Sequence, residues 1–258
     1  DAQMNDTRIC LENILMADLK GAHVANQVEV VDFIKENTKC IGVQAKDRLT
    51  GKVFQVRANQ ILSTTGPWSD QLLKKDALKN KNILRPTKGI HLVYRGQISD
   101  KAFLLQSSLD RRIFFVIPFN GQTLIGTTDT DYEGSPDRLE VEQEEIDYLL
   151  KEASRVFPQI EFKKENIITS FAGLRPLVYE RGSVSKVSRR HTIDRTFSGL
   201  WYIAGGKYTT YRAIAKECLL KIFPKQTLKL PEEMEYPLYG SAKVSLDIKQ
   251  TAGYFGVD

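Results

Sequence analysis

The spacing of hydrophobic residues changes several times along the chain, and each change marks an element. In the first 60 residues, apolar positions recur at helical spacing up to Gly21 and alternate as in strands after it. Asn5 or Asp6 supplies the N-cap of this helix, because a short polar side chain can accept hydrogen bonds from the first turn. The pattern predicts a helix over residues 7–20 and a β-meander over residues 22–33, 40–47 and 52–57.

A short apolar run at residues 60–63 leads into the turn TGPWSD, and a helical stretch follows at residues 71–75. Gly66 before Pro67 indicates an extended turn, and Ser69 or Asp70 can cap the helix that follows. The lysine-rich stretch 74–81 is typical of a solvated connector. We therefore place a domain boundary near residue 85.

Longer strand patterns follow the connector. Asn120-Gly121 between two of them is a strong hairpin signal. An amphipathic helix is predicted at residues 142–157, because apolar residues fall on one of its faces. The predicted strands cover residues 85–95, 102–106, 112–119, 123–128, 167–171 and 184–193, with a polar loop at 129–137 and a turn at FAGLRP after residue 171. This part indicates an antiparallel sheet with the helix across it.

Residues 199–222, GLWYIAGGKYTTYRAIAKECLLKI, combine a compact apolar run, a glycine pair and a helical pattern. They predict a strand at 200–204, a tight turn at Gly205-Gly206, and a helix whose start holds Lys207, Thr209 and Thr210. Glycine suits such a turn because it adopts positive φ and lets a ligand approach the backbone. The unpaired N–H groups of a helix start attract anionic or electron-rich atoms.

Together these patterns predict a mixed α/β fold of two domains. Residues 1–85 and 197–224 form a discontinuous nucleotide-binding domain, residues 86–196 form the antiparallel-sheet domain, and residues 225–258 form a connector with one short helix at 244–254. The runs 61–64 and 200–204 are both short and apolar and end in glycine turns. We expect them to be parallel neighbours in one sheet.

Composition narrows the classes of partner. The chain has 258 residues, of which 41% are hydrophobic, so it can bury a proper core. Its net charge of +5 comes from scattered basic residues, which argues against nucleic acid and suits an anionic small substrate or an acidic membrane surface. Cys10, Cys40 and Cys218 lack metal-ligand spacing, so no metal site is predicted, and their apolar surroundings indicate buried, reduced thiols. No segment has the length of a transmembrane helix, so we expect at most peripheral membrane contact.

Three motifs occur in an order that resembles one family. They are TGPWSD at residues 65–70, FAGLRPL at 171–177 and GGKYTTYR at 205–212, and similarity runs from NDTRICLEN at residue 5 to about residue 230. In these motifs the chain resembles the FAD-dependent glycerol-3-phosphate dehydrogenases and the related glycerophosphate oxidases. The resemblance implies a partial FAD-binding domain of the amino-acid-oxidase-like type beside a substrate-binding sheet. It also implies oxidation of sn-glycerol 3-phosphate to dihydroxyacetone phosphate, with electrons passed to quinone or oxygen.

The resemblance assigns several residues to FAD. Val30 would lie against the adenine, and Thr65 and Gly66 would contact the cofactor at a strand end. The turn and helix start formed by Gly205, Gly206, Lys207, Thr209 and Thr210 would hold the pyrimidine edge of the flavin. From residue chemistry alone, each of these segments is also compatible with a strand or turn that binds nothing.

Oxidising an alcohol with a flavin requires a base for the hydroxyl proton and cations for an anionic substrate. We assign catalytic roles to His91, in KGIH, and to Arg175, whose planar fork suits phosphate. Substrate binding falls to Arg175, Arg189, His191 and Lys207. His191 is the alternative base, since it lies two residues from Arg189 on the same strand face. The structural alternatives are a solvated surface charge for each arginine and a packing role for each histidine.

Nothing in the chain matches GxGxxG, the dinucleotide fingerprint that the resembling family carries near its N-terminus. We therefore expect a fragment without the pyrophosphate-binding unit and without a C-terminal domain, which binds FAD weakly or not at all and is inactive by itself. The resemblance implies association with the bacterial or mitochondrial inner membrane, or else a cytoplasmic location. Two other interpretations stay open: an amino-acid-oxidase-like flavoenzyme acting on an amine or amino acid, and a non-catalytic fragment.

Overall fold

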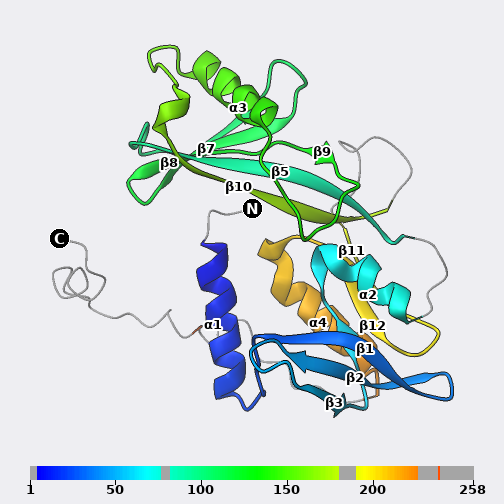
Figure 1. The fold of residues 1–258 in the computed structure, drawn as a ribbon. Coiled ribbons are helices and arrows are strands. Elements are labelled where there is room, and N and C mark those ends of the chain that lie inside the picture. The colour runs from blue at the N-terminus through cyan, green and yellow to red at the C-terminus, as the bar shows by residue number, and fades with distance from the viewer. Residues whose placement is uncertain (1–4, 77–81, 180–189, 226–237, 239–258) are drawn as a thin grey trace.

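The computed structural model describes residues 5–76, 82–179, 190–225 and 238, and it confirms the mixed α/β class (Figure 1). An upper part contains a six-stranded sheet with a helix across it. A lower part contains two three-stranded sheets and their helices, drawn from both ends of the described chain.

The first elements of the lower part follow the predicted pattern. Helix α1 (Asp6–Leu19) begins at the N-cap Asn5, whose side chain accepts a hydrogen bond from the Arg8 N–H at 3.0 Å. The meander follows as one antiparallel sheet in the order β1-β2-β3, formed by β1 (Val28–Glu36), β2 (Lys39–Asp47) and β3 (Val53–Arg57). The helix and the meander are therefore confirmed, although β1 starts later than predicted.

The second sheet of the lower part joins distant segments. Strand β4 (Leu62–Ser63) pairs in parallel with β12 (Trp201–Gly205), and β11 (His191–Arg195) pairs with β12 in the antiparallel sense. The expected parallel neighbours are confirmed. Helical segments follow each parallel strand: η1 (Gly66–Trp68) and α2 (Ser69–Lys75) after β4, and η4 (Tyr208–Thr210) and α4 (Tyr211–Ile222) after β12.

The upper sheet is antiparallel throughout. Its order is β10-β5-β8-β7-β6, with β9 on the edge of β5, and its strands are β5 (Leu84–Tyr94), β6 (Phe103–Gln106), β7 (Ile113–Phe119), β8 (Gln122–Gly126), β9 (Thr130–Asp131) and β10 (Ile167–Val178). Helix α3 (Gln143–Val156) crosses one face, and the short η2 (Lys164–Asn166) leads into β10. In the core between helix and sheet, Leu149 and Ala153 join Ile90, Leu92 and Ile125. The predicted helix across an antiparallel sheet is confirmed.

Strand β10 corrects one prediction. FAGLRPL lies inside this 12-residue strand and not in a turn, with Phe171 opposite His91 and Arg175 opposite Thr87. Pro176 is tolerated because β10 is the edge strand of its sheet, where a missing N–H removes no bond to an outer neighbour. The position of Arg175 is therefore set by strand pairing.

Smaller corrections concern single segments. Cys10 is exposed, whereas Cys40 and Cys218 are buried as predicted. The polar loop at 129–137 contains β9. The helix predicted at 244–254, most of the connector 225–258, and the predicted strand 184–193 up to and including Arg189 lie outside the described residues. The domain bounds remain a prediction.

Among the described helices, none combines the length and the apolar character that crossing a bilayer requires.

Candidate functional site

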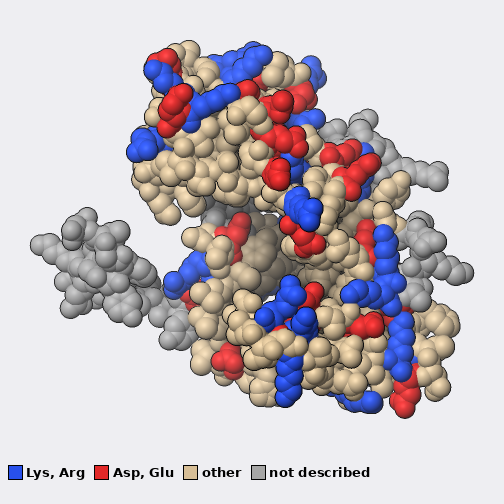
Figure 2. Space-filling model, in the orientation of Figure 1, with Lys and Arg blue, Asp and Glu red and all other residues tan. Residues whose placement is uncertain are grey.

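Helix α3 covers one face of the upper sheet, and the other face faces the lower part of the molecule. Ile90 and Leu92 of β5 are fully buried under α3, so Gly89 and His91, which alternate with them, point to the opposite face. On β10, Arg175 is aligned two positions beyond the partner of Gly89 and lies on the same face. Figure 2 shows the surface hollowed between the upper and lower parts. We call this side of the sheet, away from α3, the open face.

The guanidinium of Arg175 is held by the loop that follows β8. Its Nη1 donates to Asp129 Oδ1 at 3.1 Å, and its Nη2 donates to Thr127 Oγ1 at 2.8 Å and to the Thr128 carbonyl oxygen at 3.2 Å. The side chain of Arg175 is 25% exposed and that of Asp129 is 26% exposed. The cation is thus fixed by neighbours but still accessible to an anionic group.

His91 lies on the same open face in an apolar setting. Its ring stacks on Phe171, with centroids 5.2 Å apart and an interplanar angle of 14°. Burial and, second, the positive charge of Arg175 lower the pKa of His91 to about 4. Gly126, opposite His91 in the β5–β8 pairing, leaves room for the ring, because a Cβ there would lie 2.8 Å from His91 Cγ. His91 is therefore neutral at pH 7, the form that can accept a proton.

A buried ion pair supports the loop beneath Arg175. Lys88, whose side chain is 5% exposed, contacts Glu145 at 2.9 Å and Glu142 at 3.1 Å. Burial acts to lower the pKa of Lys88, but the bonds to these two carboxylates outweigh it and raise that pKa. Thr128 donates to Glu145 Oε1 at 3.1 Å and accepts from the Ile90 N–H at 3.0 Å. The first turn of α3 thus anchors the loop that carries Thr127 and Asp129.

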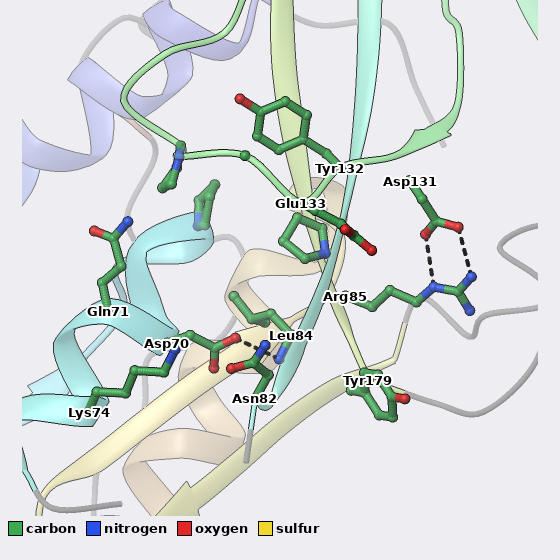
Figure 3. A pocket seen from close by; sticks show the side chains of 14 residues that line it. Asp70, Gln71, Lys74, Asn82, Leu84, Arg85, Asp131, Tyr132, Glu133 and Tyr179 are labelled. Atoms are coloured by element: carbon green, nitrogen blue, oxygen red, sulfur yellow. Dashed lines mark hydrogen bonds and ion pairs between the residues drawn. The ribbon is translucent and has the colours of Figure 1, made fainter. Parts of the chain in front are cut away.

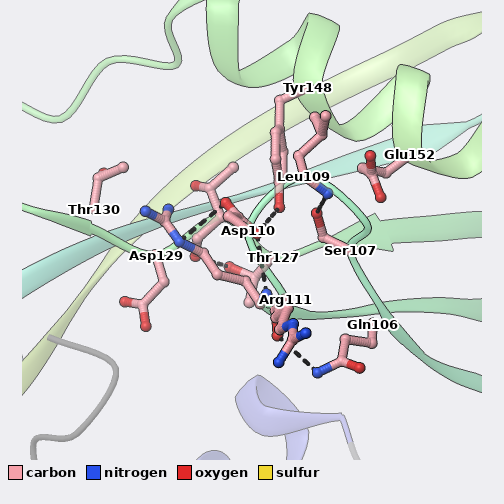
Figure 4. A network of polar contacts seen from close by, with 12 residues as sticks. Gln106, Ser107, Leu109, Asp110, Arg111, Thr127, Asp129, Thr130, Tyr148 and Glu152 are labelled. Atoms are coloured by element: carbon pink, nitrogen blue, oxygen red, sulfur yellow. Dashed lines mark hydrogen bonds and ion pairs between the residues drawn. The ribbon is translucent and has the colours of Figure 1, made fainter.

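Helix α3 also anchors the turn between β6 and β7 (Figure 4). Tyr148 donates to Asp110 Oδ1 at 3.0 Å, and Glu152 accepts from the Ser108 N–H at 2.9 Å. Figure 4 draws Thr127 and Asp129 beside this turn. One helix therefore fixes two loops at the same end of the sheet.

The predicted cofactor residues lie at one edge of the other sheet. Thr65 lies two residues after the end of β4, and Gly205 is the last residue of β12. Because these strands are parallel neighbours, both residues lie at neighbouring carboxyl ends. Thr65 Oγ1 is 3.2 Å from Ser63 Oγ and 3.3 Å from Ser69 Oγ. Carboxyl ends of parallel strands are where open α/β sheets bind their ligands. This placement fits the assignment of both turns to a nucleotide cofactor.

The glycines of these turns are required for different physical reasons. Gly66, Gly205 and Gly206 all have positive φ, at 51°, 72° and 93°. A Cβ on Gly205 would lie 2.9 Å from Val178 and closer still to the Arg190 carbonyl, so its packing alone excludes a side chain. A Cβ on Gly66 would meet nothing within 4 Å, which leaves open space for a ligand.

The helix start after β12 is as predicted, except that it opens with the 3₁₀ turn η4. Lys207, Thr209 and Thr210 are exposed there, and within the described chain neither η4 nor α4 has a side-chain cap. Thr210 Oγ1 donates to the Lys207 carbonyl oxygen at 3.0 Å. Uncapped helix starts favour electron-rich groups, which suits the edge of a flavin ring. Val30 lies in the other sheet of the lower part, in β1 opposite Ala45.

His191 has a different neighbourhood from His91. It lies on β11, and its Nε2 is 2.8 Å from Glu217 Oε2 of α4, while Glu217 Oε1 contacts Lys221 at 3.0 Å. The predicted partner Arg189 lies outside the described residues. Of the predicted substrate residues, the structure brings Arg175 and His91 together on one face and holds His191 against α4.

A groove of about 860 Å³ lies between α2 and the start of β5 (Figure 3). One wall carries the pair Arg85–Asp131, with two hydrogen bonds of 2.8 Å. Neither His91 nor Arg175 lines it, so this groove is not part of the candidate site.

Sequence reasoning missed the residues that hold Arg175. Thr127 and Asp129 fell at the boundary between a predicted strand and a polar loop, and Gly89 was noted only as part of KGIH. The available signal was the run TTDTD directly after an apolar strand, since several hydroxyl and carboxylate groups in succession can hold a cation from a neighbouring strand.

Comparisons with known proteins cover most of the chain. Residues 1–217 match the family described as FAD dependent oxidoreductase. The chain is 37% identical over 236 residues to the aerobic glycerol-3-phosphate dehydrogenase of Staphylococcus haemolyticus, which covers 88% of this chain and 42% of that protein. It is 33% identical over 307 residues to the alpha-glycerophosphate oxidase of Streptococcus pneumoniae, which covers 93% of this chain and 50% of that protein.

A solved structure is similar over the same region. The glycerol-3-phosphate dehydrogenase from Bacillus halodurans, complexed with FAD, matches with a TM-score of 0.78 at 34% identity, over 89% of this chain and 45% of that one. The chain thus spans about half the length, or less, of these relatives.

Proposed function

This chain belongs to the family of FAD-dependent oxidoreductases, and from that premise we propose that it serves the oxidation of sn-glycerol 3-phosphate to dihydroxyacetone phosphate. The names of its relatives support this substrate, and the geometry of the open face supports the chemistry. The chain contributes the substrate-binding sheet and the two strand ends that border the cofactor.

The observation that carries the proposal is a neutral histidine beside a held arginine. His91 and Arg175 lie on one face of neighbouring strands, and the charge of Arg175 contributes to the low pKa of His91. A cation binds the phosphate of the substrate, and an uncharged imidazole takes the proton of its hydroxyl group. The same pair of residues thereby orients the substrate and begins its oxidation.

FAD would be held by Val30, by Thr65 and Gly66, and by the turn and helix start of residues 205–210. When bound, FAD supplies the acceptor for the hydride that leaves the substrate carbon. The residues of this chain keep that carbon oriented, through Arg175 on the phosphate and His91 on the hydroxyl. Lys207, which precedes η4, adds positive charge on the cofactor side, and Arg189 and His191 complete the proposed substrate set.

The final acceptor is quinone or oxygen in this proposal. Transfer to quinone places the protein at the bacterial or mitochondrial inner membrane, and the net charge of +5 suits peripheral contact with acidic lipids. Transfer to oxygen requires no membrane and is compatible with a cytoplasmic location.

The substitution Arg175→Lys tests the phosphate contact in the holoenzyme. Lysine keeps the charge but cannot make the two-pronged contact. We expect binding of glycerol 3-phosphate to weaken by about 1.5–3 kcal/mol, about ten- to more than a hundredfold in affinity. Turnover of glycerol, which lacks the phosphate, should change little.

Steady-state kinetics with both substrates is the measurement. Equal losses for both would mean that Arg175 supports the fold and not the phosphate. An unchanged KM for glycerol 3-phosphate would remove Arg175 from the site.

A further inference from the structure

Gly89 lies directly beneath the guanidinium of Arg175. It is buried in β5, and a Cβ there would lie 2.6 Å from Arg175 Nη2 and 2.7 Å from Nη1, and closer still to Thr127 Oγ1. Its φ is not in the positive region that favours glycine, unlike that of Gly66 or Gly205. The backbone would accept another residue at this position, so the requirement for glycine comes from the space that the fork of Arg175 occupies.

Thr127 and Asp129 restrain the same fork from the side. Thr127 Oγ1 accepts from Nη2 at 2.8 Å, and Asp129 Oδ1 accepts from Nη1 at 3.1 Å. Both terminal nitrogens are therefore bonded, which restrains rotation about the last bonds of the side chain. Arginine otherwise loses much conformational freedom when it binds a ligand.

We propose that Gly89, Thr127 and Asp129 are positioning residues that form a cradle for Arg175 and set its guanidinium in the orientation that receives the anionic group of the substrate. This inference rests on the proposed function, because it concerns the same anion. It adds that recognition of the phosphate depends on the lack of a side chain at Gly89 and on the loop of Thr127 and Asp129, which α3 anchors.

The substitution Gly89→Ala tests the cradle most directly, because it changes no charge and removes no hydrogen-bonding group. The atoms that its methyl group meets are the ends of two side chains, so the fold can adapt while the fork moves. In the holoenzyme we expect KM for glycerol 3-phosphate to rise by about tenfold or more, with kcat changed far less. Titration calorimetry with glycerol 3-phosphate on the holoenzyme reduced beforehand, whose FAD cannot accept a hydride, should show the same loss of affinity without turnover. An unchanged affinity in a folded Gly89→Ala variant would overturn the proposal.

A double variant distinguishes positioning from a general defect. If Gly89 acts through Arg175, then Gly89→Ala should cost little further affinity in an Arg175→Lys background, since the fork is already gone. The full loss repeated in that background would mean that Gly89 acts by another route, and the proposal would be wrong.

Thr127→Val provides a second variant that leaves Gly89 intact and decides the matter even if Gly89→Ala does not fold. It removes the shorter of the two hydrogen bonds that hold Nη2, the other going to the Thr128 carbonyl oxygen, but keeps the shape of the side chain. Its matched control is Thr130→Val, three residues along, whose hydroxyl contacts only the Lys88 carbonyl oxygen, at 3.5 Å, among the described bonds. We expect KM for glycerol 3-phosphate to rise in Thr127→Val, to stay at the wild-type value in Thr130→Val, and to be restored by Thr127→Ser. Equal behaviour of Thr127→Val and Thr130→Val would overturn the proposal.

The two proposals fail in different ways. If Arg175→Lys binds glycerol 3-phosphate as the wild type does, the proposed function is wrong about the anion and the cradle has no ligand to serve. If Arg175→Lys is impaired while Gly89→Ala and Thr127→Val are not, the cradle alone is wrong.

Discussion

The low pKa of His91 depends on residues that are far from it in the sequence. Phe171 stacks on its ring, and Gly126 leaves room for the ring because it has no side chain. Burial and, second, the positive charge of Arg175 lower the pKa to about 4. A histidine in water has a pKa of about 6.5, so the folded protein opposes protonation of this ring. That difference is a measurable contribution to stability.

The stability of the protein should therefore fall on acidification through His91. Between about pH 6.5 and about pH 4 the unfolded chain takes up a proton that the folded His91 does not, so the free energy of unfolding decreases as pH falls through this window. The variant His91→Asn lacks this contribution. Denaturant unfolding at a series of pH values should show the wild type losing more stability than the variant down to about pH 4, with a constant difference below. Parallel curves over the whole range would contradict the assigned pKa.

At the scale of elements, a clean hydrophobic period made prediction possible. Helix α3 was predictable because its apolar residues recur on one face and an acidic first turn precedes them. The second half of strand β10 was not, because Gly173 and Pro176 are turn formers in sequence, and this strand accepts Pro176 only because it lies at the edge of its sheet. The pairing that brings Arg175 beside Gly89 and Thr127 is a tertiary contact, which no local pattern records. The sequence could therefore indicate Arg175 but not what holds it.

The first turn of α3 should contribute strongly to stability through Glu145. This buried carboxylate accepts from Lys88, from Thr128 and from the Glu142 N–H. Glu145→Ala leaves the buried ammonium of Lys88 with fewer partners and should lower the free energy of unfolding by about 3 kcal/mol. The exposed neighbour Glu144 gives a matched control, since Glu144→Ala should change it by less than about 0.5 kcal/mol. Urea denaturation measures both, and equal effects of the two variants would refute the role of the buried pair.

At the scale of the whole molecule, the two ends of the upper sheet pack into the lower part, where Leu84 and Val178 join a hydrophobic cluster with Leu200 and Tyr202. The end of β10 reaches the turn after β12, where Val178 lies against Gly205, and Trp68 Nε1 donates to Asp137 Oδ1 at 2.8 Å across the parts. The packing at Gly205 leaves no room for a side chain. This junction should therefore tolerate substitution less well than the nearby turn at Gly66.

Two glycine variants test this difference in the protein without added FAD. Both Gly205→Ala and Gly66→Ala place a side chain at positive φ, which costs about 1–2 kcal/mol. Gly205→Ala also drives a methyl group into the Arg190 backbone and should cost about 3 kcal/mol or more in total. Thermal and denaturant unfolding give the comparison. A Gly66→Ala variant as destabilised as Gly205→Ala would show that backbone conformation, and not packing, governs both positions.

The register of β5 and β10 affects how a protein of this fold can change during evolution. Leu84 at the start of β5 lies opposite Val178 at the end of β10, so the chain leaves the lower part and returns to it through paired neighbours. Among the described residues, the strands of the upper sheet are thus encoded by one uninterrupted stretch of gene, whereas the elements of the lower part are encoded in two. A recombination event that replaces this stretch has to match two adjacent strand ends and the side-chain contacts that join the two parts, among them Trp68–Asp137. Such an exchange carries Arg175 and His91 along with the upper sheet, whereas His191 and Lys207 stay with the lower part.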